Sequence, residues 1–328
     1  MARSTAAVAS RRRTPSREAS GELQPERSGH FLGLSTSGFH ETAYVEWGPA
    51  DAEHVVVCVH GLTRQGRDFD HLAAHLSGRG VRVVCPDLIG RGRSSWLRDP
   101  KNYTIPQYCS DMNALIARTG AAKVDWVGTS LGGLIGLGLA GFTGHPIRRL
   151  VINDIGPTVP ADGLLRIGRY VAAMPSGFAS LEEAERYLRN VLAPFGSLSD
   201  EHWRHLALHS VHRDEAEDRY VTLCDPRIVQ AYYSTERASA HLWTYWDAID
   251  VPTLVVRGAD SDLLPLYLAR EMTRRNPYAV LHDVPGCGHA PTLTTPDQIA
   301  TVAAFLLEDR PPRGEAQGGR DNVRQPEA

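Results

Sequence analysis

A serine that lies between glycines is the strongest candidate for a reactive group in this chain. Residues 127–133 hold Ser130 in the pattern G-x-S-x-G, between a strand-like segment, Lys123–Val127, and an apolar segment, Leu131–Phe142, long enough for a buried helix. The glycines allow a tight strand-to-helix turn, which pushes the serine hydroxyl outward. The N–H groups at the start of the helix would stabilise a negative oxygen beside the serine. Gly-Ser turns are also common in ordinary loops, so the interpretation of Ser130 as a nucleophile depends on partners elsewhere.

Loops after later strands offer those partners. Acyl transfer by a serine needs a base, a carboxylate that orients the base, and donors for the negative oxygen that forms. Asp154 follows one predicted strand, Asp260 and Asp262 follow the next, and His289 follows the last. Because the carboxyl ends of parallel strands lie at one edge of a sheet, we expect these loops to meet.

His289 is one of fourteen histidines, and most histidines in proteins are packed or solvated. Its position distinguishes it, because it lies in a glycine-bearing loop just beyond the last predicted strand. His282 lies within that strand, whereas His202, His205 and His209 lie on a predicted helix. We therefore predict that His289 is the base.

A set of motifs together resembles the α/β-hydrolase superfamily over residues 33–307. These motifs are Val59-His60-Gly61-Leu62-Thr63, Asp87-Leu88-Ile89-Gly90-Arg91-Gly92-Arg93-Ser94, the Ser130 turn, Gly258 to Asp262, and Gly288-His289. Their order and spacing are far more specific than any one motif. The resemblance implies an eight-stranded, mostly parallel sheet with its second strand antiparallel, helices on both faces, and a helical lid inserted after strand six. It implies no cofactor and no metal.

The same resemblance implies how the site is divided among residues. The backbone N–H groups of Leu62 and Leu131 would form the oxyanion hole. The family's usual acid follows strand seven, which matches Asp262, although Asp260 is close enough to compete. Some relatives place the acid after strand six, so Asp154 is the alternative acid.

Strand-like segments alternate with helical ones between residues 29 and 310, which predicts an α/β fold with a parallel sheet covered on both faces. The predicted strands are Ala43–Trp47, His54–Val59, Val81–Cys85, Lys123–Val127, Arg149–Asn153, Thr253–Arg257 and Ala279–Val284. Capping boxes at Thr104 and Thr295 predict helices over Ile105–Arg118 and Pro296–Leu307.

Between Gly156 and Trp246 the sequence has no convincing strand. Helices are predicted over Leu164–Met174, Leu181–Leu192 and Asp200–His212. We therefore divide the chain into a core of residues 29–156 and 247–310 and a helical lid of residues 157–246. Some of the lid's many aromatic residues could face a substrate pocket. They are Tyr170, Phe178, Tyr187, Phe195, Trp203, Tyr232, Tyr233, Trp243, Tyr245 and Trp246.

The composition argues for a soluble protein in the cytoplasm. The net charge is −3, which gives no general attraction to nucleic acid or to an anionic membrane. The five cysteines are an odd number and are scattered, as in a reducing compartment. Residues 131–142 are too short an apolar stretch to cross a bilayer, which needs about 20 residues. Residues 1–28 and 311–328 are predicted to be disordered tails, and no apolar segment of an export signal follows the arginines of the first.

The sequence thus predicts a serine hydrolase that cleaves carboxylic esters or lactones through Ser130, His289 and Asp262, acting on a small acyl substrate. A C–C bond or amide hydrolase with the same residues is an alternative, as is a receptor-like protein that binds a ligand on a hydrolase scaffold. Arg64 could recognise a carboxylate of the substrate, or it could belong to a solvated loop. Cys287 is interpreted as packing and Asp87 as structural.

Overall fold

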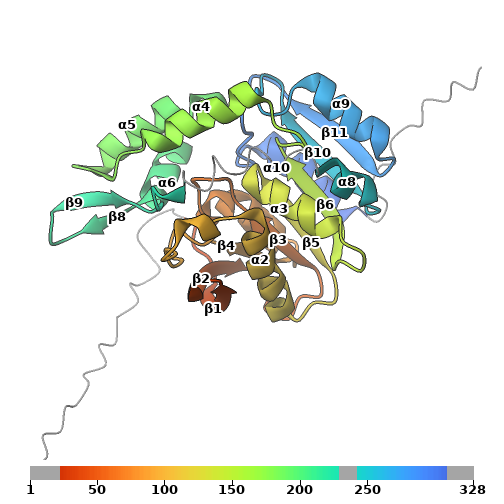
Figure 1. Cartoon of the computed structure of the whole chain (residues 1–328), viewed down its shortest axis with the longest axis horizontal. Helices are drawn as coiled ribbons and strands as arrows, with labels where there is room; N and C mark the ends of the chain where they lie inside the picture. The colour runs from red at the N-terminus through yellow and green to blue at the C-terminus, as the bar shows by residue number, and fades with distance from the viewer. Residues whose placement is uncertain (1–22, 229–241, 309–328) are drawn as a thin grey trace, which may run out of the picture.

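The computed structural model of the chain describes residues 23–228 and 242–308 (Figure 1). The predicted tail over residues 311–328 lies outside these ranges, as do residues 1–22 of the other tail. Within the two described ranges, no helix has the length and apolar character needed to cross a membrane.

An eight-stranded sheet forms the centre of the molecule, in the order β1-β2-β4-β3-β5-β6-β10-β11 (Figure 1). Its strands are β1 (Arg27–Ser35), β2 (Gly38–Trp47), β3 (Val55–Val59), β4 (Arg82–Pro86), β5 (Val124–Thr129), β6 (Ile147–Asn153), β10 (Thr253–Gly258) and β11 (Ala279–Val284). Strand β2 pairs antiparallel with both of its neighbours, and all the other pairs are parallel. The expected mostly parallel sheet with an antiparallel second strand is therefore confirmed.

Strand β3 shows why the central strands lack alternation between polar and apolar residues. All five of its residues are buried. Val55, Val57 and Val59 pack into the core on one face of the sheet, while Val56 and Cys58 pack into the core on the other. Because helices cover both faces, both sets of side chains must be apolar.

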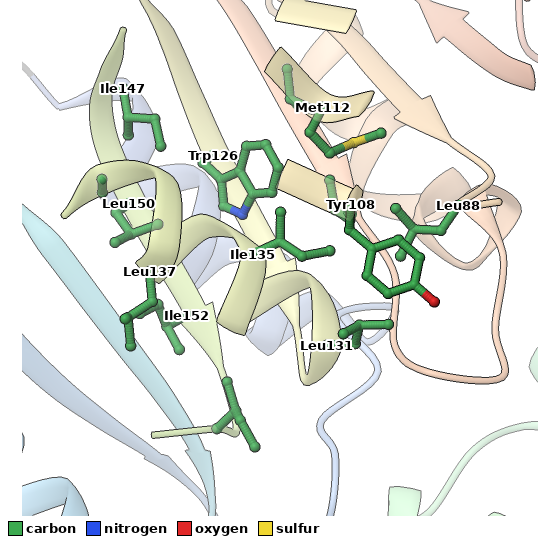
Figure 2. Close-up of a cluster of buried hydrophobic side chains, with 14 of the residues drawn as sticks. Leu88, Tyr108, Met112, Trp126, Leu131, Ile135, Leu137, Ile147, Leu150 and Ile152 are labelled. Carbon is green, nitrogen blue, oxygen red and sulfur yellow. The ribbon is translucent and has the colours of Figure 1, made fainter. Parts of the chain in front are cut away.

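The two faces of the sheet are covered by different helices. One core contains residues of α2 (Ile105–Thr119), α3 (Leu131–Ala140), α8 (Leu242–Ala248) and α9 (Leu266–Arg275), and the other contains residues of α1 (Asp70–Ser77) and α10 (Pro296–Leu307). Figure 2 shows Trp126 of β5 beside Ile135 of α3, within the first core. The Trp126 indole N–H donates to the carbonyl of Gly132 at 3.0 Å, which fixes α3 against the strand that precedes it.

Strand β1 was not among the predicted strands, and it moves the boundary of the first predicted tail. Arg27 and Ser28 pair with β2, and the Arg27 guanidinium bonds the Glu46 carboxylate at 3.0 Å. The exposed positions of β1 include Leu32 and Leu34, so its polar and apolar residues do not separate by face. This mixed pattern explains why the sequence did not reveal the strand.

The described residues that follow β6, from α4 to β9, form a layer of their own at one side of the molecule (Figure 1). It contains α4 (Ala161–Ala172), α5 (Leu181–Val191) and α6 (Asp200–Ser210), which confirms the predicted helices with small changes at their ends. It also contains a three-stranded sheet of β7 (Gly177–Phe178), β9 (Arg219–Thr222) and β8 (Val211–Asp214), in that order. The expectation of a strand-free insertion was therefore wrong. The sequence did not reveal these strands, because strands this short carry no detectable periodicity.

Short 3-10 helices occur at η1 (Gly66–Phe69), η2 (Pro100–Asn102) and η3 (Ala193–Phe195).

The far end of the predicted lid belongs to the core instead. Trp246 of α8 is fully buried in the first core, and its indole N–H donates to the carbonyl of Met272 on α9 at 3.0 Å. The side chain of Tyr245 lies against Gly141, just after α3. The insertion thus ends before α8 rather than at residue 246. We refer below to residues 157–228 as the insertion.

Candidate active site

Ser130 occupies the sharp turn between β5 and α3. Its backbone has φ 52° and ψ −112°, a region that residues with side chains rarely adopt and that costs about 1–3 kcal/mol. A side chain at Gly128 would place its Cβ 2.2 Å from the carbonyl oxygen of Gly132, so strand and helix can approach this closely only at a glycine. The Ser130 N–H donates to the carbonyl of Asn153 at 2.9 Å, which ties the turn to the end of β6.

His289 joins Ser130 to a carboxylate. Its Nε2 lies 2.9 Å from Ser130 Oγ, and its Nδ1 lies 2.9 Å from Asp154 Oδ2. An ionised carboxylate only accepts hydrogen bonds, so Nδ1 carries the proton and Nε2 is left to accept the serine hydroxyl. The side chain of His289 is 10% exposed and that of Asp154 is fully buried. This geometry is the one that a serine needs in order to lose its proton to a base.

Asp154 is surrounded by hydrogen-bond donors. The N–H of Gly258 donates to its Oδ1 at 2.8 Å, and the Ser261 hydroxyl donates to its Oδ2 at 2.7 Å, in addition to His289. Its backbone φ is 59°, a left-handed turn that directs the side chain along the carboxyl edge of the sheet. Donors from two further loops thus stabilise a buried negative charge, which would otherwise be costly.

The structure corrects the preference for Asp262. The Asp262 carboxylate is bound by the Arg166 guanidinium of the insertion at 2.6 and 2.7 Å, and its side chain is 44% exposed. This hydrogen bond lowers the pKa of Asp262. Asp260 is exposed as well. The loop after β10 therefore contributes Ser261 to the site, and the carboxylate beside His289 is Asp154, the alternative acid.

The turn after β3 lies against the serine. A Cβ on Gly61 would lie 3.6 Å from the Cβ of Ser130, so the backbone that leads into Leu62 passes close to the serine. Leu131 is the first residue of α3, so its N–H has no acceptor within the helix. These are the two groups that the resemblance assigned to an oxyanion hole.

Arg91 holds this turn in place, a role that sequence reasoning missed. It is fully buried, and its Nε donates to the carbonyl of Leu62 at 2.7 Å. One of its terminal nitrogens donates to the Tyr108 hydroxyl at 2.7 Å, and its guanidinium lies over the rings of Tyr103 and Tyr108. Arg91 lies in the quoted glycine-rich motif, but nothing in that motif indicates that it would point inward.

His60 and Asp87 also support the loops around the serine. Burial lowers the pKa of His60 to about 3, so its ring is neutral. Its Nδ1 donates to the carbonyl of Gly61 at 2.7 Å, and its Nε2 accepts the N–H of Leu88 at 2.8 Å. Asp87 accepts the N–H of Gly66 at 2.8 Å, in keeping with its structural interpretation.

Arg64 is buried and bound within the protein. Its guanidinium bonds the Asp68 carboxylate at 2.7 and 2.8 Å and the Ser210 hydroxyl at 2.9 Å. Burial opposes its charge, but the attraction of Asp68 outweighs burial and raises the pKa of Arg64. The interpretation of Arg64 as part of a solvated loop is therefore wrong, and its guanidinium is already paired with Asp68.

The insertion contacts both sides of the site. The Tyr170 hydroxyl of α4 lies 2.7 Å from Thr63 Oγ1, next to the turn after β3. On the other side, the N–H of Gly288 donates to the carbonyl of Pro194 in η3 at 2.7 Å, which holds the loop that carries His289.

Burial raises the pKa of Cys287 to about 12, so this thiol stays protonated, as expected for a packing residue.

Most of the remaining aromatic residues of the predicted lid that the structure describes serve packing. Phe178, Tyr187, Phe195 and Trp203 belong to the insertion's own core, and the Trp243 indole N–H donates to Thr158 Oγ1 at 2.9 Å. Tyr232 and Tyr233 lie outside the described residues. Tyr170 contacts the turn after β3 through its hydroxyl, and Phe195 lines a small cavity together with His60, Gly61 and Ala290.

Comparisons with known proteins agree with this architecture. A model of the alpha/beta hydrolase family matches residues 56–302. A 3-hydroxybutyrate-oligomer hydrolase from Cupriavidus necator is 45% identical over 287 residues, which cover 85% of this chain and 97% of that enzyme. An esterase from Mycobacterium tuberculosis is 26% identical over 259 residues, which cover 78% of this chain and 83% of that protein. The crystal structure of an alpha/beta hydrolase from Novosphingobium aromaticivorans superimposes with a TM-score of 0.75 at 32% identity, covering 86% of this chain and 99% of that one.

Proposed function

Because this chain belongs to the alpha/beta hydrolase family, we propose that it is a serine hydrolase that cleaves the ester bonds of short 3-hydroxybutyrate oligomers. The observation that carries the chemistry is the hydrogen-bonded series Ser130, His289 and Asp154. Ester hydrolysis is supported by the relatives named above, and the oligomer substrate is suggested by the one that shares 45% of its residues over nearly its whole length.

The reaction follows from the positions of these groups. His289 Nε2 takes the proton of Ser130 as Oγ attacks the ester carbonyl, and Asp154 stabilises the imidazolium that forms. The N–H groups of Leu62 and Leu131 stabilise the tetrahedral oxyanion. His289 then gives the proton to the leaving alcohol, which is the hydroxyl end of the next monomer. Water, deprotonated by His289, releases the acyl group from Ser130 as a carboxylic acid.

The insertion would act as the lid over this substrate. Its contacts with the turn after β3, through Tyr170, and with the His289 loop, through Pro194, join it to both sides of Ser130. An oligomer extends on both sides of the ester bond that is cleaved, so a cover at this place can bind the parts that do not react.

The experiment compares dimers and trimers of 3-hydroxybutyrate with a p-nitrophenyl ester, a lactone and an amide of a short acyl chain. We expect the oligomers to have the highest kcat/KM, by at least about tenfold, which corresponds to about 1.4 kcal/mol of additional transition-state binding. Preference for the lactone or the amide would overturn the oligomer proposal while leaving serine hydrolysis intact.

The nucleophile is tested separately. Ser130→Ala should lower kcat on every substrate by up to about 10⁶-fold, and a fluorophosphonate should label Ser130 in the wild type. Ser28→Ala changes an exposed serine on β1 and serves as the matched control. Equal rates for the wild type and Ser130→Ala would contradict the proposed chemistry, as would binding without turnover by the wild type.

A further inference from the structure

Histidines gather where the insertion meets the core, at a place that the proposed hydrolysis does not use. His71 lies on α1, and His202, His205 and His209 lie on α6. The ring of His71 lies 4.9 Å from that of His202 and 5.2 Å from that of His205, and the rings of His205 and His209 lie 4.6 Å apart, all measured between centroids. Asp70 stands beside them at the start of α1, with a fully buried side chain.

Three of these residues have the geometry of a ligand set. Asp70, His205 and His209 each offer one ligand atom, and the three atoms all lie within 4.8 Å of one another. His205 and His209 are four residues apart on a helix, so they project from the same face. We propose that Asp70, His205 and His209 bind a divalent transition-metal ion of the Zn²⁺ type, which bridges the insertion to the core.

The donor chemistry selects the class of ion. Imidazole nitrogen and a single carboxylate suit Zn²⁺, Co²⁺, Ni²⁺ and Cu²⁺, whereas Mg²⁺ and Ca²⁺ prefer several oxygen ligands. Ligands at about 2 Å from a tetrahedral ion lie about 3.3 Å apart, so modest side-chain rotations would bring the three atoms onto one ion. A water molecule would complete the four ligands.

The surroundings include groups that the ion must accommodate. Arg67 Nε donates to Asp70 Oδ2 at 2.6 Å, and His205 Nε2 donates to the carbonyl of Arg67 at 3.0 Å. The two oxygens of one carboxylate can serve a guanidinium and a metal at the same time, and rotation of the His205 ring exchanges its hydrogen bond for a metal bond.

Binding is measured on the untagged full chain after removal of metals with a chelator. Titration with Zn²⁺, followed by calorimetry and metal analysis, should give one ion for each chain. Substitution of a residue that only hydrogen-bonds a metal ligand already lowers metal affinity by about 10- to 100-fold. Removal of two ligands, in the combined His205→Ala and His209→Ala variant, should therefore weaken Zn²⁺ binding by at least about 100-fold. The matched control replaces two exposed histidines, His30→Ala and His212→Ala, and should bind as the wild type does.

The site must also be separated from the imidazole beside Ser130. His289→Ala should retain Zn²⁺ binding, whereas loss of binding in this variant alone would overturn the proposal. Absence of Zn²⁺ binding by the wild type would overturn it as well, as would wild-type affinity in the variant that lacks His205 and His209.

A second variant keeps the test valid if removal of two histidines unfolds the chain. His209→Cys places a thiolate at one ligand position, and titration with Co²⁺ should then produce a sulfur-to-cobalt charge-transfer band in the near ultraviolet. The matched control is His212→Cys, which should produce no such band. A band of equal strength in both variants, or in neither, contradicts the assigned ligands.

Discussion

The loops after β6 and β10 each present an aspartate at the same edge of the sheet, yet the two carboxylates have opposite environments. Asp154, in the first loop, is fully buried and accepts hydrogen bonds from Gly258, Ser261 and His289. Asp262, in the second loop, is 44% exposed and pairs with Arg166 of the insertion. Similar places in the topology therefore produced a buried, fully hydrogen-bonded carboxylate in one loop and a surface ion pair in the other.

The difference shows what makes a carboxylate able to orient a histidine. A position after a strand is insufficient, because both aspartates have it. Asp154 has in addition a set of hydrogen-bond donors around its buried carboxylate, and Gly258 and Ser261, at the end of β10 and in the second loop, supply two of them. The loop after β10 thus supports the Asp154 carboxylate of the neighbouring loop. Its own Asp262 instead pairs with Arg166 of the insertion.

Among changes in these two loops, the largest expected effect comes from Asp154→Asn. The amide would present a donor where Nδ1 of His289 also donates, which favours the wrong tautomer of the ring, so kcat for ester hydrolysis should fall by about 10⁴-fold. Steady-state kinetics with a p-nitrophenyl ester measure this loss. Asp260→Asn, in the second loop, is the matched control, and a similar loss there would contradict the contrast between the loops.

Gly258→Ala should have the next largest effect. The added Cβ would lie 2.1 Å from the carbonyl oxygen of Gly288, a contact that forces the His289 loop away from β10. Since misplacement by about 1 Å can cost about 10²-fold in rate, kcat should fall by about that factor, along with thermal stability. Gly138→Ala in α3 is the control, because its Cβ would meet its nearest neighbour, Cys109 Sγ, at an ordinary 3.5 Å. Equal activity in the two variants would show that the close approach of the loops is not required.

Ser261→Ala tests the support that the second loop gives to Asp154. It removes one hydrogen bond to a buried charge, worth about 1.5 kcal/mol, so kcat should fall by about tenfold if the carboxylate is needed in the transition state. The same assay measures the loss, and a denaturant titration reports the accompanying change in the free energy of unfolding. An unchanged kcat would mean that the remaining donors suffice.

Asp262→Asn should have the smallest effect, with kcat within about twofold of the wild type. The Arg166 pair holds the folded pKa of Asp262 below its unfolded value of 3.8, so the pair stabilises the fold above that pH. The contribution is lost as the pH falls through the folded pKa. Because the pair is partly exposed, we expect the variant to be less stable by no more than about 1 kcal/mol at pH 7.

Denaturant titrations of the wild type and Asp262→Asn at neutral pH and well below 3.8 measure this contribution. The two proteins should differ at neutral pH and converge in acid. A loss of several orders of magnitude in kcat for Asp262→Asn would reverse the roles that we give to the two loops.

Much of the architecture was predictable because it depends on local patterns. Runs such as Val55–Val59 indicate strands covered on both faces, and glycines around Ser130 indicate a turn where strand and helix nearly touch. Patterns of this kind are absent from β1 and from the short strands of the insertion, so these elements went unrecognised. The inward direction of Arg91 was equally hidden, since its neighbours in the sequence are ordinary turn residues.

The residue types and their order along the chain were enough to indicate the fold class, the serine and the histidine. The choice between Asp154 and Asp262 was not, because both lie next to strand ends and the direction of each side chain depends on contacts between loops distant in sequence. The backbone of Asp154 turns through φ 59° and directs its carboxylate toward donors from residues 258, 261 and 289. Asp262 instead meets Arg166, which approaches from the insertion. Only the folded chain brings these partners together, since hydrogen bonds and burial act over a few ångströms while these residues lie about a hundred positions apart along the chain.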